Sequence, residues 1–402
     1  TQLWKPQIGT VFSCSDFPRQ RMTELFIVAA ERSGDELGAA LIRDLKAREE
    51  SISIEGIGGE SMALAGTPSL MDITGLNILG FVEALKNYSL VLRKVRECVD
   101  IILQKSPDAV ILIDSWGFMV RVAQRLKAAG FDGKIIKYVA PQVWAMRSGR
   151  SRTLARSVDL LLSIQPMDAP YFQRHGLETV YVGNPVFDMD FSKGQGADIE
   201  AQFGLGHRPL LSVWFGSRPS EIATLAEDFK KTVLSLKRTF PDLVVCVPVV
   251  ESIKTQLEPY LDEMRELEGI HIVDEAEKLA VMSASTAALA CSGTVTSQLA
   301  GFGVPTVVAY RVNAITYFLA KQIFKPDHIS IVNIAAEREL LPEFIQDDVS
   351  PPILAEAVSQ YLNSAKARDF ASQALLAQTR LMGAGTGQKA SEKAAQAILA
   401  AL

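Results

Sequence analysis

Residues 287–310, AALACSGTVTSQLAGFGVPTVVAY, are the stretch in which the fold of this chain is clearest. An apolar run over 287–291 leads into Ser292, Gly293 and Thr294, and a helical stretch, a Gly-Val-Pro break and a second apolar run follow. Both runs lack the alternation of a half-exposed strand, as strands buried in a parallel sheet do. The stretch therefore predicts a strand–turn–helix–strand unit with backbone amides and hydroxyls open at the start of the helix.

The same alternation of short apolar runs and helical segments continues through the 402 residues of the chain. Amphipathic helical segments such as 35–48, 88–105 and 220–238 separate short runs rich in Val, Ile and Leu. The runs predicted to be strands are 25–30, 52–57, 109–113, 135–139, 160–164, 179–183, 209–215, 243–249, 269–273, 287–291 and 305–310. Strands that alternate with helices form parallel sheets, and a chain of this length commonly has two domains. We therefore predict the α/β class, with two doubly wound Rossmann-like domains.

The alternation is interrupted at 184–208, where Pro185 precedes a polar run and a Gly-Leu-Gly triplet. The predicted domains are therefore 22–185 on the N-terminal side and 186–364 on the C-terminal side. Residues 365–402 are rich in Ala and have a helical pattern with no strand after them. We expect these last helices to pack back on a domain or to be exchanged between two subunits.

Residues 1–21 stand apart from this pattern. They lack the apolar centre of a secretory signal, and the first methionine, Met22, comes just before the first predicted strand. We expect residues 1–21 to be upstream sequence or a flexible tail rather than a docking arm, with Met22 as the native start.

Composition and spacing exclude several classes of protein. The net charge of −5 is too near neutrality to indicate bulk nucleic-acid binding. The four cysteines are widely spaced and the four histidines lie far apart, so reduced core thiols are expected and a zinc site is not. An Asp-x-Asp at 188–190 lies in the interdomain linker, and we expect no metal role for it. The turns after 209–215 and 287–291 lack the Gly-rich motif of P-loop enzymes, and the turn after 25–30 lacks that of dinucleotide dehydrogenases. No cofactor is expected.

Two strand ends in the second half have residues suited to an anion. Ser217 and Arg218 follow the predicted strand 209–215, and Ser292, Gly293 and Thr294 follow 287–291. Amides and hydroxyls at a helix N-terminus favour a phosphate, and an arginine adds fixed positive charge. Ligands of open α/β sheets bind beyond the carboxyl ends of the strands, so these two corners predict a phosphate site.

Two strand ends in the first half have carboxylates. Asp114, after 109–113, is either a general base for a substrate hydroxyl or a cap of the next helix, and the residues alone leave both interpretations open. The same holds for the corner after 25–30, where a helix N-terminus faces the cleft or is simply capped. The residues of that corner are Glu31, Ser33, Gly34 and Asp35.

The second half of the chain has two anion corners and the first half has a carboxylate at a strand end. This distribution predicts a sugar-nucleotide glycosyltransferase. One domain would hold the diphosphate leaving group through its anion corners, while the other positions the acceptor beside Asp114.

Several sequence blocks point to a known family. The blocks AERSGDELGAALIRDLKA, LIDSWGF, YVAPQVWAMRSGR, FGSRPSEI, CSGTVTSQLA and IVNIAAERELLPEFIQDD occur in the order and spacing of lipid-A-disaccharide synthases. The chain resembles that family from about Met22 to its C-terminal end. The Val-Trp-Ala-x-Arg block, the Ser-Gly-Thr corner and the Asn333 block are together specific, although each is weak alone.

The resemblance implies a fold and a reaction. It implies a GT-B-like fold, with the two domains facing each other across a cleft, and transfer of 2,3-diacylglucosamine from its UDP donor to 2,3-diacylglucosamine 1-phosphate. The products would be UDP and the β-1,6-linked lipid A disaccharide precursor, formed with inversion and without a metal. It further implies a peripheral enzyme on the cytoplasmic face of the inner membrane of a Gram-negative bacterium, and it favours a homodimer.

The resemblance also implies roles for particular residues. Asp114 matches the proposed base of the family. The positions that match blocks lining the UDP side are Ser217, Arg218, Ser292, Gly293, Thr294, Asn333, Arg338 and Gln346. Gln298 stands where the family has a carboxylate suited to ribose hydroxyls, and an amide there still forms hydrogen bonds. The other departures from the family pattern are Ala30, Trp116-Gly117, Asn184, Phe215 and Glu337.

Residues 76–96 combine apolar side chains with a basic end. The apolar residues expected to touch a membrane are Ile78, Leu79, Phe81, Val82 and Leu85. The segment suits a bilayer interface that admits acyl chains, and it equally suits a helix whose apolar face belongs to the core. The lipid substrates implied by the resemblance favour peripheral membrane binding.

Two alternative functions remain open. One is a glycosyltransferase that uses another UDP-sugar and acceptor, as in peptidoglycan assembly. The other is a non-catalytic relative that binds lipid or a partner, which the departures at Gln298 and Asn184 keep open. Activity is favoured because several family residues survive together: Asp114, Arg218, the Ser-Gly-Thr corner, Asn333 and Arg338.

Overall fold

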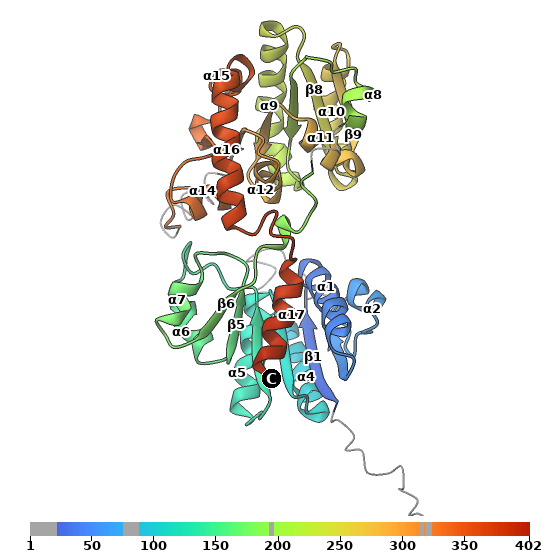
Figure 1. Ribbon diagram of the computed structural model, residues 1–402, viewed down its shortest axis with the longest axis vertical. Helices are drawn as coiled ribbons and strands as arrows, with labels where there is room; N and C mark the ends of the chain where they lie inside the picture. Colours follow the sequence, from blue (N-terminus) through green and yellow to red (C-terminus); the bar gives the residue numbers. More distant parts are fainter. Residues whose placement is uncertain (1–21, 75–87, 193–196, 314–316, 318–323) are drawn as a thin grey trace, which may run out of the picture.

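The computed structural model describes residues 22–74, 88–192, 197–313, 317 and 324–402. The residues expected to touch a membrane, Ile78, Leu79, Phe81, Val82 and Leu85, lie outside this part of the chain. Figure 1 shows two α/β lobes, one above the other along the long axis of the molecule. Each lobe has a six-stranded parallel sheet with helices on both faces.

The first sheet has the strand order β2-β1-β3-β4-β5-β6. Its strands are β1 (Thr23–Ala29), β2 (Ile52–Ile57), β3 (Ala109–Ile113), β4 (Lys134–Tyr138), β5 (Leu160–Ser163) and β6 (Glu178–Tyr181). All neighbouring strands are parallel, so their carboxyl ends lie along one edge. Ile113, at the end of β3, pairs with Tyr138, at the end of β4.

Helices cover both faces of this sheet. They are α1 (Arg32–Arg48), α2 (Glu60–Leu64), α4 (Tyr88–Lys105), α5 (Trp116–Ala128), α6 (Gly149–Ala155) and α7 (Ala169–Gln173). Side chains of α4 and α5, such as Cys98 and Val122, pack on one face with Phe26 and Leu112. On the other face α1 packs beside the last helix of the chain. The central strands, such as β3 and β5, are buried along their whole length, as a sheet covered on both faces requires.

The second sheet has the order β12-β11-β10-β7-β8-β9 and is also parallel throughout. Its strands are β7 (Leu210–Trp214), β8 (Val244–Val249), β9 (Ile270–Asp274), β10 (Ala287–Cys291), β11 (Thr306–Tyr310) and β12 (Glu343–Ile345). Its helices are α8 (Ala197–Gln202), α9 (Pro219–Thr239), α10 (Lys254–Arg265), α11 (Lys278–Ala284), α12 (Thr294–Gly301), α14 (Ile331–Ala336) and α15 (Pro351–Asn363). Short 3-10 helices join some of them: η1 (Pro185–Phe187), η3 (Glu251–Ile253), η4 (Glu275–Glu277) and η5 (Gln346–Asp348).

The two C-terminal helices attach to different lobes. The first, α16 (Ala365–Leu381), packs on α12, α14 and α15 of the second lobe. The second, α17 (Ala390–Ala401), crosses back and buries Ala394 and Ile398 against α1 of the first lobe. The Asp188 carboxylate accepts the Ala390 amide at 2.9 and 3.1 Å, so this residue of the Asp-x-Asp caps α17.

The structure confirms the predicted fold class, because both lobes are doubly wound parallel α/β units. Every predicted strand range overlaps a strand of the structure. The strand β12 was not predicted, because it is three residues long, half-buried and preceded by a proline. Within the described part of the chain, no helix combines the length and the apolar character needed to cross a membrane.

Candidate functional site

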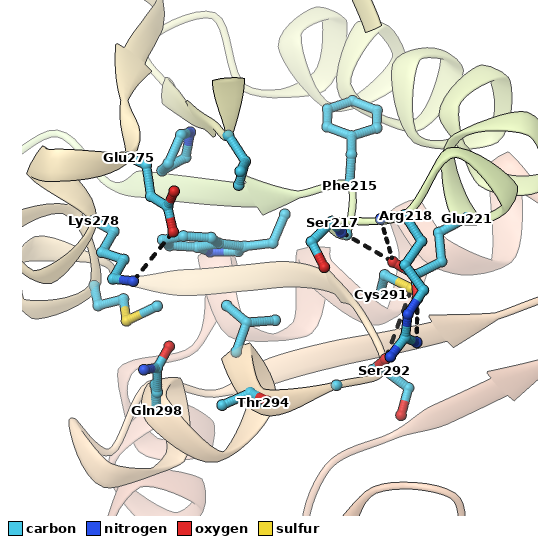
Figure 2. Close-up of a pocket in the computed structure, with 17 residues that line it drawn as sticks. Phe215, Ser217, Arg218, Glu221, Glu275, Lys278, Cys291, Ser292, Thr294 and Gln298 are labelled. Atoms are coloured by element: carbon cyan, nitrogen blue, oxygen red, sulfur yellow. Dashed lines mark hydrogen bonds and ion pairs between the residues drawn. The ribbon is translucent and has the colours of Figure 1, made fainter. Parts of the chain in front are cut away.

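A cavity of about 300 Å³ lies at the carboxyl ends of the strands in the second lobe. Figure 2 shows that the ends of β7 and β10 contribute to its wall, as do the starts of α9 and α12. Its lining residues with polar side chains are Trp214, Ser217, Arg218, Glu221, Glu275, Lys278, Ser292, Thr294 and Gln298. The two predicted anion corners therefore open into one cavity.

The corner after β7 differs from the expectation in one respect. The amides of Ser217 and Arg218 were expected to be open to a phosphate, but both donate to the Glu221 carboxylate at 3.0 and 3.2 Å. Glu221 is 7% exposed and also accepts the Arg218 guanidinium at 3.1 Å, which completes a capping box. The corner therefore presents the Ser217 hydroxyl and a guanidinium held by Glu221, rather than free amides (Figure 2).

Gly216 allows this arrangement of the corner. Its φ is +96°, a left-handed conformation that favours glycine. A Cβ at this position would come within 2.2 Å of the Glu221 carboxylate, so a larger residue would displace the buried carboxylate.

The corner after β10 is formed by Ser292, Gly293 and Thr294. Thr294 begins α12, and the Thr296 hydroxyl donates to the Gly293 carbonyl at 2.7 Å, which orders the first turn. No described heavy atom lies within 4 Å of where a Gly293 Cβ would be, apart from its neighbours in the chain. The first amides of a helix have no partner within the helix, so this turn suits an anionic ligand.

The far end of the cavity was not identified from the sequence. Lys278 begins α11 and pairs with Glu275 at 3.3 Å (Figure 2). Trp214, the last residue of β7, also lines the cavity, and its indole N–H is buried without a partner among the described residues. The position of Glu275 directly after β9 was the signal in the sequence, since polar residues at strand ends face the ligand edge.

Gln298 lines the cavity, whereas Asn333, Arg338 and Gln346 do not. Asn333 is fully buried and bonds the carbonyl of Leu341 at 2.7 Å and the amides of Leu340 and Leu341 at 2.8 and 2.9 Å. Its side chain therefore folds the loop before β12. Arg338 is exposed on that loop.

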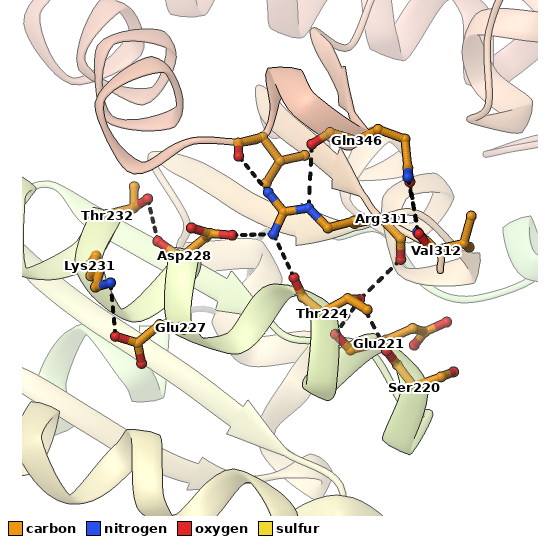
Figure 3. Close-up of polar contacts among 11 residues, drawn as sticks. Ser220, Glu221, Thr224, Glu227, Asp228, Lys231, Thr232, Arg311, Val312 and Gln346 are labelled. Atoms are coloured by element: carbon orange, nitrogen blue, oxygen red, sulfur yellow. Dashed lines mark hydrogen bonds and ion pairs between the residues drawn. The ribbon is translucent and has the colours of Figure 1, made fainter. Parts of the chain in front are cut away.

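Gln346 belongs to a polar cluster around Arg311, whose residues Arg311, Val312 and Gln346 do not line the cavity (Figure 3). Its amide exchanges hydrogen bonds with the backbone of Val312 at 2.8 and 3.0 Å. Beside it Arg311 pairs with Asp228 at 2.5 Å and donates to the carbonyls of Thr224 and Val349 at 2.9 and 2.6 Å. These bonds join the end of β11 to α9 and to the loop before α15, so the cluster supports the cavity without lining it.

In the first lobe, Asp114 is the residue directly after β3. Its φ is +51° and that of Ser115 is +34°, so the chain turns through two left-handed residues. Its backbone amide donates to the Tyr138 carbonyl at 2.9 Å, and its carboxylate accepts the Ser33 hydroxyl at 3.3 Å. The carboxylate is half-buried at the edge where ligands of such sheets bind. The structure thus brings Ser33 and Asp114 together.

The other residues of the first corner are Glu31, Gly34 and Asp35, and the clearest structural role among them is that of Asp35. Glu31 precedes α1 without a side-chain capping bond, and Gly34 packs close to Ala29 and the Ile113 carbonyl. Asp35 is 4% exposed and accepts the amides of Gly59, Ser61 and Met62 at 2.7, 2.8 and 3.1 Å. Asp35 therefore caps the start of α2 rather than the helix that follows β1, and its assignment to the acceptor cleft stays a prediction.

We expect Asp35→Ala to lower the free energy of unfolding by about 2–4 kcal/mol, because three amides lose their acceptor. Urea denaturation of the variant measures this loss. The turnover number of the folded protein is expected to stay within about two-fold of wild type, since the carboxylate is buried against the start of α2. Glu36→Ala, on the exposed side of α1, is the control and should change neither quantity. A folded Asp35→Ala protein of normal stability and low turnover would contradict the capping role.

The Val-Trp-Ala block lies in the same lobe, after β4. The Trp144 indole donates to the buried Asp168 carboxylate at 3.0 Å, and burial raises the pKa of Asp168 to about 7. The Ala145 carbonyl accepts the Lys325 amide at 3.0 Å. The block is thus fixed from within and touches a segment of the second lobe.

Comparison with known proteins gives a consistent result. A family model described as lipid-A-disaccharide synthetase matches residues 25–400. The lipid-A-disaccharide synthase of Paramagnetospirillum magneticum is 39% identical over 379 residues, which are 93% of this chain and 96% of that protein.

Solved structures with this fold are more distant in sequence. The glycotransferase of kitacinnamycin has a TM-score of 0.62 at 15% identity, over 96% of this chain and 100% of that one. The UDP-GlcNAc 2-epimerase of Neisseria meningitidis, bound to UDP-GlcNAc, has a TM-score of 0.57 at 12% identity, over 94% and 99%. At these identities the likeness is one of fold.

Proposed function

The chain belongs to the lipid-A-disaccharide synthase family, and we propose that it transfers 2,3-diacylglucosamine from a UDP donor to 2,3-diacylglucosamine 1-phosphate. It is a glycosyltransferase of lipid A biosynthesis with the GT-B fold. The observation that carries the proposal is the single cavity into which both anion corners open. An anion held between a guanidinium and a helix N-terminus is favoured by charge and by hydrogen bonds.

The proposed donor site has three parts. Arg218, Ser217 and the Ser292–Thr294 turn would hold the pyrophosphate of UDP. The Gln298 amide, on α12, would bond the ribose hydroxyls. The unpartnered Trp214 indole N–H and the Glu275–Lys278 pair would face the uracil at the far end.

The proposed reaction uses Asp114 as the general base. The carboxylate would take the proton of the acceptor 6-hydroxyl while that oxygen forms its bond to the anomeric carbon of the donor. The bond from that carbon to the UDP oxygen breaks on the opposite face, so the product is β-linked and UDP leaves with the electron pair. Positive charge at Arg218 and the amides of α12 would stabilise the developing diphosphate. No step in this scheme requires a metal.

We also propose that the protein works at the cytoplasmic face of the inner membrane, where its acylated substrates reside. Exposed apolar residues support this proposal: Leu64 is 82% exposed and Leu70 is 41% exposed, on the chain that leads to residue 75. The exposed basic residues of α4, Arg93 and Arg96, follow the segment expected to touch the membrane, and anionic lipid attracts such charges. A homodimer remains a prediction.

Turnover with the acylated substrates tests the proposed function. Purified protein supplied with UDP-2,3-diacylglucosamine and 2,3-diacylglucosamine 1-phosphate is expected to release UDP and form a disaccharide phosphate. Omission of the acceptor is the control, and donors of several acyl lengths define the preference. Release only from an unacylated UDP-sugar would indicate another acceptor class, and no release by the folded protein would favour a binding function.

A further inference from the structure

The first sheet contains one lysine in an unusual place. Lys137, the penultimate residue of β4, is 1% exposed. Its neighbours across the sheet are Leu112 on β3 and Leu161 on β5. An apolar side chain would fit these surroundings without the cost of taking a charge out of water. A role other than packing is therefore required to explain the lysine.

The Lys137 ammonium is bonded to the backbone of the Asp114 corner. Its Nζ donates to the Asp114 carbonyl at 2.7 Å and to the Tyr138 carbonyl at 2.9 Å. The Asp114 amide also donates to the Tyr138 carbonyl. The Lys137 ammonium thus joins the carboxyl ends of β3 and β4 at Asp114 itself.

The backbone around this ammonium is strained. Asp114, Ser115 and Val139 have φ values of +51°, +34° and +73°, and none of them is glycine. A left-handed conformation is unfavourable for side chains with a Cβ, above all for a β-branched valine. Such strain persists only where surrounding contacts fix the chain, and it gathers at functional sites. The bonds of Lys137 are among the contacts that fix this turn, beside the bonds of the Asp114 and Val139 amides.

The electrostatics agree with a link between the two residues. Burial lowers the pKa of Lys137 to about 7, while the negative charge of Asp114 opposes part of this shift. Among the described residues, Asp114 is the charged group that acts on the ammonium. Below neutral pH a positive charge therefore stands behind the Asp114 corner.

We propose that Lys137 is a positioning residue for the transfer reaction: it holds the left-handed turn that aims the Asp114 carboxylate at the acceptor. The proposal rests on the proposed role of Asp114 as the base. It assigns Lys137 no contact with substrate, so its effect is on catalysis rather than on donor binding.

Substitutions of Lys137 test the proposal by their kinetics. Lys137→Met is expected to lower kcat by about 10- to 100-fold, because a small displacement of the base is costly. The donor KM should stay within about two-fold, since the UDP site lies in the other lobe.

Two further variants test the hydrogen bonds of Lys137. Lys137→Gln keeps a donor for a carbonyl, so its loss in kcat should be smaller than that of Lys137→Met. Lys137→Arg keeps more than one donor, so its kcat should lie closer to that of wild type. Lys134→Met, the same change at the exposed start of β4, is the matched control and should alter none of these quantities.

A folded Lys137→Met protein with wild-type kcat would overturn the proposal. If that variant does not fold, Lys137→Gln decides: a lower kcat at an unchanged donor KM, restored in Lys137→Arg, supports the proposal, and a wild-type kcat or a raised donor KM overturns it. The companion variant Asp114→Asn keeps the two proposals apart. Retained turnover in Asp114→Asn would reject the base itself, whereas an inactive Asp114→Asn beside a normal Lys137→Met would reject only the role of Lys137.

Discussion

Asp114→Asn is expected to lower kcat by about 10²- to 10⁴-fold while the protein stays folded. The amide cannot accept the acceptor's proton, which is the step assigned to the carboxylate. Asparagine suits the test because it tolerates the left-handed conformation that Asp114 adopts, with its φ of +51°. The backbone of the corner, including its bond to Tyr138, should therefore be unchanged.

The measurement is UDP release at saturating donor and acceptor, with the thermal midpoint recorded for each protein. Protection by UDP should match wild type, because Asp114 lies in the first lobe and the cavity in the second. Asp132→Asn, at the opposite end of the first sheet, is the control and should turn over normally. A kcat within about ten-fold of wild type would show that another group accepts the proton.

Arg218→Ala should weaken UDP binding by about 10- to 100-fold. The guanidinium is 72% exposed toward the cavity and held by Glu221 at 3.1 Å, so it is oriented before a ligand arrives. A charge-assisted hydrogen bond contributes about 1.5–3 kcal/mol, which corresponds to this loss of affinity. Thermal unfolding with increasing UDP measures the loss as a smaller rise of the midpoint.

Arg338→Ala is the informative companion to this variant. The family resemblance implies the UDP side for Arg338, whereas the structure has it exposed on the loop before β12, outside the cavity lining. Its UDP protection should therefore equal that of wild type. Loss of protection in Arg338→Ala, with normal protection in Arg218→Ala, would move the phosphate site away from the cavity.

The alternation of apolar runs and helical segments was sufficient to predict both sheets. Buried parallel strands are apolar along their whole length, so runs such as 109–113 and 287–291 are visible without any structure. The strand β12 escaped because Glu343 and Ile345 lie at the edge, and an edge strand of three residues has no distinct pattern. The sequence of α17 does not indicate that this helix packs on the first lobe, because that packing depends on which part of the first sheet the other helices leave uncovered.

The site was predictable only in part, for a physical reason. A polar residue at a strand end has the same sequence pattern whether it faces a ligand or satisfies a backbone amide. Ser292 and Arg218 line the cavity, whereas the side chains of Asp35 and Asn333 accept hydrogen bonds from backbone amides. Lys137 was not identified, because a single lysine within an apolar run gives no indication that it bonds a neighbouring strand.

Because α17 packs on the first lobe, its residues report the position of that lobe in any measurement of the distance between the two lobes. Met22 and Leu402 line the same surface hollow, so a pair of fluorophores on these two residues would report a constant separation whatever the lobes do. Phe370 is close to Leu402 in sequence but lies on α16, which packs with the second lobe, and it is 76% exposed. Labels at Phe370 and Leu402 would therefore follow the motion that labels at Met22 and Leu402 miss.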